Sequence, residues 1–284
     1  MIDLHTHTTF SDGQYTPEEV VQLASKAGVS VLAITDHDTV DGVERGKIAA
    51  DIAGIRFVSG IEISCAGNKE LHLLGYNIDI KDSGILSACE AFSRFRIERA
   101  EKIINYLDKN GLSLTLADVV AAAGSVNIIS RSHFALAMMN KGYVKTTREA
   151  FDRYLGTPEF DVIERPKPTA SEGIDMILAS GGVPVLAHPI MLKLCDEKLE
   201  SMIQDLASCG LRGLECHYSA NTKSQTALYC LLAQKYGLLI TGGSDFHGEK
   251  YKPNIKIGTG IDNSLLFNDN TVADALFSQH QPEL

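Results

Sequence analysis

The segments Ile2-Asp3-Leu4-His5-Thr6-His7 and Val31-Leu32-Ala33-Ile34-Thr35-Asp36-His37-Asp38 share one pattern, a short apolar run that ends in histidine and aspartate. Between them, Thr16-Pro17-Glu18-Glu19 is typical of a helix start, with Thr16 as N-cap and Glu19 closing a capping box. A strand, a helix and a second strand in this order predict a β/α unit of a parallel sheet or barrel.

The same alternation continues along most of the chain. Further strands are predicted at residues 56–58, 71–76, 183–187, 213–216 and 238–241, and further helices at 169–179, 199–208, 224–236 and 271–277. Residues 83–155 break the rhythm, because they show helical periodicity and no convincing strand. We therefore expect an α/β fold in which a parallel sheet or barrel formed by residues 1–82 and 156–284 is interrupted by a small helical subdomain at 83–155.

Histidines and carboxylates gather at or just beyond the ends of the predicted strands. The candidate metal ligands are His5, His7, Asp12, His37, Glu62, His72, His188, Asp245 and His247. The carboxyl ends of barrel strands converge on one face, so side chains as distant in sequence as His5 and His247 can meet there. Imidazole and carboxylate hold Zn²⁺, Mn²⁺ or Fe²⁺, and these nine groups exceed what one ion can use. The sequence thus predicts a cluster of two or three metal ions in an enzyme, a hydrolase above all.

Each signal taken alone also has a plainer interpretation. A lone His-X-His pair often consists of two surface histidines. Asp36 and Asp38 are better placed to cap the next helix or to orient a ligand than to bind metal directly. His72 lies inside an apolar strand, where a histidine is more often a core residue.

Composition excludes several classes of function. The chain has 284 residues, 44% of them hydrophobic, and a net charge of −10, so a broad basic surface for long nucleic acids is not expected. No apolar run approaches the length of a membrane span, and the six cysteines lack metal-ligand spacing. The opening residues show no signal-peptide pattern, so a cytoplasmic location is expected. No feature indicates an obligate protein partner.

The set of motifs, in this order, resembles the PHP (polymerase and histidinol phosphatase) family of metal-dependent phosphoesterases. The matching motifs are His5-Thr6-His7, Thr35-Asp36-His37-Asp38, Ala187-His188-Pro189 and Ser244-Asp245-Phe246-His247, with Glu62 and His72. The resemblance covers essentially the whole chain. It implies a distorted (β/α)7 barrel with two or three divalent ions, Mn²⁺ being favoured over Zn²⁺ or Fe²⁺.

The resemblance also implies how the ligands are shared. His5, His7, Glu62 and Asp245 would hold one ion, and Glu62 would bridge to a second ion held by His72 and His188. Asp12, His37 and His247 would hold a third. Many family members have histidine where this chain has Asp12, which leaves occupancy of the third site open and favours harder ions such as Mn²⁺ there.

The predicted insert contains a second similarity, Ile129-Ser130-Arg131-Ser132-His133-Phe134. It resembles the segment with which the small-nucleotide branch of the family reaches over the metals to the substrate, so the insert is expected to cover the substrate. Arg131 is suited to bidentate binding of phosphate, and His133 to a hydrogen bond with the phosphate or the leaving oxygen. His217 is a further candidate substrate contact. Arg165 is either a cation on the substrate side or part of a linker, and His280 in the polar tail is expected to have no role.

The resulting hypothesis is a phosphoesterase that uses metal-activated hydroxide on small nucleotides. Arg131, His133 and Asp245 would take part in catalysis, and no phospho-enzyme is expected. The expected substrates are 3′,5′-bisphosphonucleosides, with short 5′-phosphorylated oligoribonucleotides as related substrates. Histidinol phosphate phosphatase is the alternative enzyme, and a non-catalytic PHP module is the alternative of another class. A zinc amidohydrolase is disfavoured, because Glu62 occupies the bridging position and no persuasive bridging lysine follows a strand.

Overall fold

The computed structural model describes residues 1–123, 129–265 and 267–278. Its centre is a seven-stranded sheet whose strands follow one another in sequence order. They are β1 (Ile2–Asp3), β2 (Val31–Ile34), β3 (Arg56–Ser64), β4 (His72–Tyr76), β5 (Val183–Leu186), β6 (Gly213–Tyr218) and β7 (Leu239–Gly243). The strands predicted from the sequence are all present, and β3 runs further than expected, so that Glu62 lies within it.

The sheet curls so that its first and last strands meet. The backbone N–H of Leu4 donates to the carbonyl of Gly242 at 3.2 Å, and the N–H of Asp245 donates to the carbonyl of His5 at 2.8 Å. Gly243 permits this approach, because a Cβ on it would lie 2.3 Å from the Cβ of His5. This nearly closed barrel confirms the expected fold class.

The distortion of the barrel lies at β4. This strand pairs antiparallel with both β3 and β5, whereas the other pairs in the barrel sheet are parallel. Because β4 runs the opposite way, its first residue, His72, lies at the same end of the barrel as the carboxyl ends of the other strands. His72 therefore faces the site although it begins a strand.

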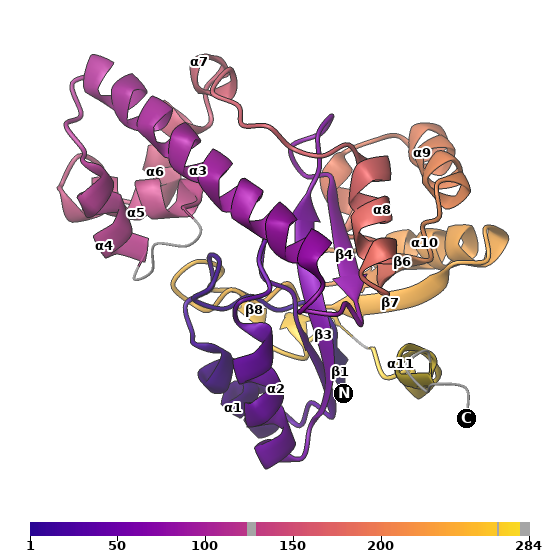
Figure 1. Ribbon diagram of the computed structural model, residues 1–284. Helices are drawn as coiled ribbons and strands as arrows, with labels where there is room; N and C mark the ends of the chain where they lie inside the picture. The colour runs from indigo at the N-terminus through magenta and orange to yellow at the C-terminus, as the bar shows by residue number, and fades with distance from the viewer. Residues whose placement is uncertain (124–128, 266, 279–284) are drawn as a thin grey trace.

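Helices cover the outside of the barrel, as Figure 1 shows. They are α1 (Pro17–Ala27), α2 (Val43–Ala53), α8 (Ala170–Ala179), α9 (Asp196–Ser208), α10 (Lys223–Lys235) and α11 (Asn270–Ser278). The capping box between Thr16 and Glu19 is present, and Gly28 ends α1 with a left-handed φ of 77°. A short 3-10 turn, η2 (Pro189–Leu192), and a small hairpin of β8 (Ile255–Lys256) and β9 (Gly260–Ile261) complete this part. Among the described residues, no helix is both long and apolar enough to cross a bilayer.

A helical segment projects to one side of the barrel and is reached by the 27-residue helix α3 (Ser83–Lys109). It contains α4 (Leu116–Ala123), α5 (Arg131–Asn140), α6 (Thr147–Ala150), a π-helical turn η1 (Phe151–Leu155) and α7 (Pro158–Asp161). The segment has its own apolar cluster, which includes Ile103, Phe134, Leu155 and Phe160. In Figure 1, α4, α5 and α6 lie together at the far end of α3, away from α8, α9 and α10.

Candidate metal centre

All nine side chains singled out as ligands meet at one end of the barrel. Their ligand atoms form four overlapping groups, in each of which the atoms lie within 4.8 Å of one another. The groups are His7–Asp12–His37–His247, His5–His7–Asp245, His5–Glu62–His188 and His37–Glu62–His72. His72 and His188 fall into different groups, although a ring nitrogen of each lies 2.9 Å from Oε1 of Glu62.

Glu62 lies at the centre and presents its two oxygens to different imidazoles. Its Oε1 is 2.9 Å from Nδ1 of His72 and 2.9 Å from Nε2 of His188. Its Oε2 is 3.3 Å from Nε2 of His5, 3.2 Å from Nε2 of His7 and 3.0 Å from Nδ1 of His37. A carboxylate arranged in this way can bridge two metal ions through separate oxygens.

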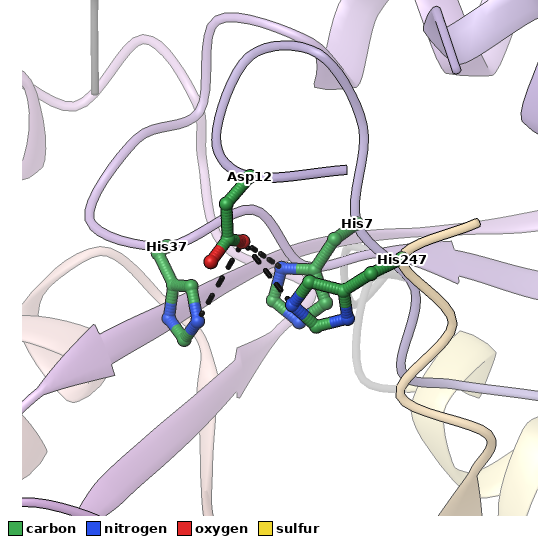
Figure 2. Close-up of side chains that lie close together, drawn as sticks. All are labelled: His7, Asp12, His37 and His247. Atoms are coloured by element: carbon green, nitrogen blue, oxygen red, sulfur yellow. Dashed lines mark ion pairs between the residues drawn. The ribbon is translucent and has the colours of Figure 1, made fainter. Parts of the chain in front are cut away.

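Asp12 lies among three imidazoles, those of His7, His37 and His247, as Figure 2 shows. Its Oδ1 is 3.1 Å from Nε2 of His247 and 3.9 Å from both Nδ1 of His7 and Nε2 of His37. Asp12 comes from the loop after β1, His37 from the loop after β2 and His247 from the loop after β7. Three loops from neighbouring strands thus converge on one carboxylate oxygen.

The donor atoms fit bound divalent ions. Asp12 Oδ1, His37 Nδ1, Glu62 Oε2 and His188 Nδ1 are buried without a hydrogen-bond partner among the described residues, which is costly unless another group satisfies them. Burial would raise the pKa of Glu62, but His37, His5 and His72 hold it well below its ordinary value. Burial also lowers the pKa of His72 and of His247 to about 4, so both imidazoles are neutral and able to bind metal at neutral pH.

A layer of hydrogen bonds behind the candidate ligands fixes their orientation. Oε1 of Glu215 lies 2.9 Å from Nδ1 of His5, and its Oε2 accepts the backbone N–H of His188 at 2.6 Å. Asp36 accepts bonds from Thr8 and Ser11 in the loop that carries Asp12. Such contacts set the ring orientation and basicity of metal-binding histidines.

Backbone strain coincides with the site. His188 has a φ of 27°, Asp245 a φ of 57° and Asp38 a φ of 58°, all in the region that non-glycine residues seldom adopt. Asp245 is also held through its other oxygen, because Tyr218 donates to Oδ2 at 2.9 Å and Lys252 at 2.5 Å. The fold therefore keeps these side chains in one orientation at an energetic cost, which is common at functional sites.

A cavity of about 320 Å³ opens over the candidate ligands, and basic side chains line its other walls. They are Lys69, Arg96, Arg99, Arg131, Arg165, Lys167 and Lys252. Asp38 accepts from both Arg96 and Arg165, the latter at 2.6 Å, and thereby joins α3 to the segment that leads back into the barrel. Carboxylates and imidazoles below and guanidinium groups above make a site for an anion that contacts metal ions.

Comparison with known proteins agrees with this geometry. Residues 3–164 match the PHP domain. The chain belongs to the PHP family. A 3′,5′-nucleoside bisphosphate phosphatase from Chromobacterium violaceum is 30% identical over 87% of both chains. A 5′-3′ exoribonuclease from Haemophilus influenzae is 32% identical over 86% of this chain and 89% of its own. The crystal structure of a Bifidobacterium adolescentis protein described as a metal-dependent phosphoesterase superposes with a TM-score of 0.83 at 30% identity, covering 99% of this chain and 96% of that one.

Two residues predicted at the substrate side of this PHP site do not line the cavity. His133 is buried in the first turn of α5, where its Nδ1 accepts the backbone N–H of Ser130 at 3.2 Å, and it does not line the cavity. His217 packs against Phe267, with ring centroids 5.2 Å apart, and is also outside the cavity. Arg131 does line the cavity, and its side chain is 33% exposed. His280 lies outside the described residues.

Sequence reasoning overlooked several members of the PHP site. Glu215 was assigned only to a strand, because an acidic residue inside an apolar run gives no further signal of its role. Arg96 was assigned only to a helical segment, although it follows the buried Phe92 by four residues and precedes the buried Ala100 by four. An arginine on the apolar stripe of a helix is the signal that could have identified it. Lys167 and Lys252 carried no such signal.

Proposed function

We propose that this PHP protein hydrolyses phosphate esters of small nucleotides, with the nine histidine and carboxylate side chains as ligands of two or three divalent ions. It is a hydrolase of phosphoric esters, as its relatives' names indicate. The observation that carries the proposal is the position of Glu62. Its two oxygens face separate sets of imidazoles directly below a cavity lined by arginine and lysine.

The chain's own groups have distinct tasks in this reaction. When bound, divalent ions supply the Lewis acidity that makes water a nucleophile near neutral pH and neutralises phosphoryl oxygens. Glu62 and Asp245 would hold such ions, and Tyr218 and Lys252 fix Asp245 through hydrogen bonds to Oδ2. Arg131, which lines the cavity, would bind the equatorial oxygens of the reacting phosphate. Among ions that accept imidazole and carboxylate, we favour Mn²⁺, because oxygen ligands such as Asp12 suit harder ions.

The proposed substrates are 3′,5′-bisphosphonucleosides, with short 5′-phosphorylated oligoribonucleotides as related substrates. The names of the two relatives support both choices. A net charge of −10 favours short substrates, because a long polynucleotide would be repelled outside the basic cavity.

We further propose that residues 83–155 form a subdomain that covers the substrate. Ser130, Arg131 and Ser132 at the start of α5 line the cavity, as do Arg96 and Arg99 of α3. The segment also has an apolar cluster of its own. Its contribution to the site is thus basic, whereas the barrel contributes the metal ligands.

The test is phosphate release by metal-stripped protein reloaded with Mn²⁺. The substrates would be 3′,5′-bisphosphoadenosine, 5′-AMP, histidinol phosphate and a 5′-phosphorylated dinucleotide. Arg131→Ala would be compared with Arg148→Ala, whose side chain is 90% exposed on α6. We expect preferential release from the bisphosphate, lost in Arg131→Ala and kept in Arg148→Ala.

Two outcomes would contradict the proposal. Preferential turnover of histidinol phosphate would contradict the proposed nucleotide substrate, whereas the proposed metal centre would stand. Bound metal without turnover of any substrate would identify a non-catalytic PHP module.

A further inference from the structure

Two cysteines outside the metal centre lie beside each other where α10 packs on β6 (Figure 1). Cys216 belongs to β6 and is fully buried, and Cys230 belongs to α10 and is partly exposed. The thiol of Cys216 donates a hydrogen bond to Sγ of Cys230. Nε2 of His217 lies 3.9 Å from the same sulfur. Two thiols and an imidazole thus form a compact group that the proposed phosphoester chemistry does not use.

Strand β6 is irregular at this group. Glu215 and His217 pair with consecutive residues of β7, so Cys216 between them is the extra residue of a β-bulge. Side chains of consecutive residues in a regular strand point to opposite faces. The bulge interrupts this alternation, and Cys216 and His217 therefore both reach Cys230.

Cys230 has the properties of a reactive thiol. The hydrogen bond from Cys216 lowers the pKa of Cys230 to about 7, although burial opposes this. A large fraction of the side chain is then thiolate at neutral pH, and the thiolate is the form that attacks peroxides. Burial lowers the pKa of His217, so its imidazole is neutral at that pH and able to accept the thiol proton. Burial instead raises the pKa of Cys65 and of Cys89 to about 12, which keeps these two thiols protonated.

Cys216 directly follows a residue that supports the candidate metal ligands. Glu215 accepts the backbone N–H of His188 at 2.6 Å, and its other oxygen lies 2.9 Å from Nδ1 of His5. Nδ2 of Asn221, in the turn between β6 and α10, donates to the carbonyl of Cys216 at 2.9 Å. A movement of Cys216 toward α10 therefore also moves the carboxylate that orients ligands on the opposite side of the strand.

We propose that Cys216 and Cys230 are a redox-sensitive pair that hydrogen peroxide converts to a disulfide, and that this disulfide weakens metal binding through Glu215. The disulfide is a property of the pair itself, whereas its effect rests on the proposed metal centre. The sulfur atoms of a disulfide are about 2 Å apart, much closer than two hydrogen-bonded thiols. Formation of the bond therefore draws Cys216 toward α10 and displaces the bulge beside Glu215.

The oxidation has two steps. The thiolate of Cys230 attacks one oxygen of hydrogen peroxide, the O–O bond breaks, and hydroxide leaves while the sulfur becomes a sulfenic acid. The proton that Cys230 gave to His217 converts this hydroxide to water. The sulfur of Cys216 then attacks that of Cys230, the S–O bond breaks, and the departing hydroxide takes the proton of Cys216. Two thiols are thereby oxidised to one disulfide, and one peroxide is reduced to two waters.

Peptide mass spectrometry tests the disulfide. Fully reduced wild type would be treated with a graded series of hydrogen peroxide, alkylated and digested without reductant. We expect a peptide pair cross-linked through Cys216 and Cys230, which a phosphine reductant separates again. Cys209→Ser, which removes an exposed thiol, is the matched control and should form the same cross-link. Absence of the cross-link in wild type, or earlier oxidation of Cys209 than of Cys230, would overturn the proposal.

Variants separate the roles of the two thiols. In Cys216→Ser the hydroxyl can still donate to Cys230 but cannot form a disulfide, so dimedone should trap the sulfenic acid of Cys230. In Cys230→Ser we expect no adduct at Cys216. His217→Gln should slow formation of the Cys230 adduct at about pH 7 but not at about pH 9, where the thiol ionises without a neighbouring proton acceptor. An adduct at Cys216 in Cys230→Ser would overturn the assignment of Cys230 as the attacking thiol.

The effect on the metal centre is measured as Mn²⁺ retained against a graded chelator series before and after oxidation. We expect the apparent affinity of wild type to fall about 10-fold on oxidation, as for other losses of support behind a ligand, and to return on reduction. Cys216→Ser and Cys230→Ser should keep their affinity after peroxide treatment. A disulfide without any change in affinity would overturn the link to the metal centre. If reduced wild type binds no Mn²⁺ but the disulfide forms, the proposed metal centre fails and the redox-sensitive pair stands.

Discussion

Glu215 and His5 form a buried pair in which Oε1 of the carboxylate lies 2.9 Å from Nδ1 of the imidazole. Neither side chain is exposed to solvent. The contact turns Nε2 of His5 toward Glu62 and His7, from which it is 3.3 Å and 3.1 Å away. Through its other oxygen Glu215 also holds the backbone of His188. One carboxylate outside the ligand set thus positions candidate ligands that follow two different strands, β1 and β5.

Replacing Glu215 should therefore weaken metal binding. In Glu215→Gln an amide replaces the carboxylate that supports His5, and we expect metal affinity to fall about 10- to 100-fold, as for other residues that support ligands from behind. Metal retained after dialysis against a graded chelator series measures the effect. Glu197→Gln at the exposed start of α9 is the control. Unchanged retention in Glu215→Gln would remove the positioning role.

Asp12 should determine the occupancy of one particular ion. Its Oδ1 is the carboxylate oxygen shared by His7, His37 and His247 in Figure 2. In Asp12→Ala we expect the metal content per chain to fall by about one ion, because that ion would lose the carboxylate oxygen that its three imidazoles share. Elemental analysis of protein reloaded with excess Mn²⁺ measures this, and Asp12→His should restore the ion. A metal content equal to that of wild type would show that Asp12 is not a ligand.

Asp38 should contribute to stability more than to metal binding. It is fully buried, and it is the shared partner of Arg96 and Arg165, whose side chains are 10% and 4% exposed. Asn tolerates the φ of 58° at this position, so Asp38→Asn removes the charge and keeps the backbone. We expect a loss of about 3–5 kcal/mol in the free energy of unfolding, because two guanidinium groups stay buried without a counterion.

Urea denaturation measures the loss, with Asp274→Asn as control because its ion pair with Arg56 is exposed and contributes at most about 1 kcal/mol.

The stability that Asp38 contributes should also depend on pH. Burial raises the pKa of Asp38, but Arg96 and Arg165 together lower it by more, so its pKa in the folded state lies below the ordinary value of 3.8. The difference between wild type and variant should then be constant above about pH 4 and shrink as the pH falls below it. A difference that grows on acidification would contradict this account.

The sequence predicted the barrel because its strands and capped helices are local patterns, and the capping box of Thr16 and Glu19 is an example that appears in the structure. It also predicted that the ligand residues would meet, since strand ends in a barrel converge. His72 shows the limit of that argument. Only the reversed direction of β4 brings its first residue to the site. The alternation of apolar residues in the sequence does not indicate in which direction a strand runs. Arg99, Lys167 and Glu215 were missed for a related reason, because their importance comes from neighbours distant in sequence.

Lys167 should give the reaction a basic limb in its pH profile. Burial and then Arg165 lower its pKa to about 8, Arg96 adds to this, and Asp38 and Cys65 oppose it. The ammonium is charged below that pH and neutral above it, so attraction for a substrate phosphate is present at neutral pH and is lost as the pH rises through about 8. In Mn²⁺-loaded protein, kcat/KM for the bisphosphate should therefore fall above about pH 8, since kcat/KM reports the free enzyme. Lys167→Arg should keep its activity to a higher pH, and Lys167→Met should be low throughout without this limb. A limb that persists unchanged in Lys167→Met would assign the titration to another group.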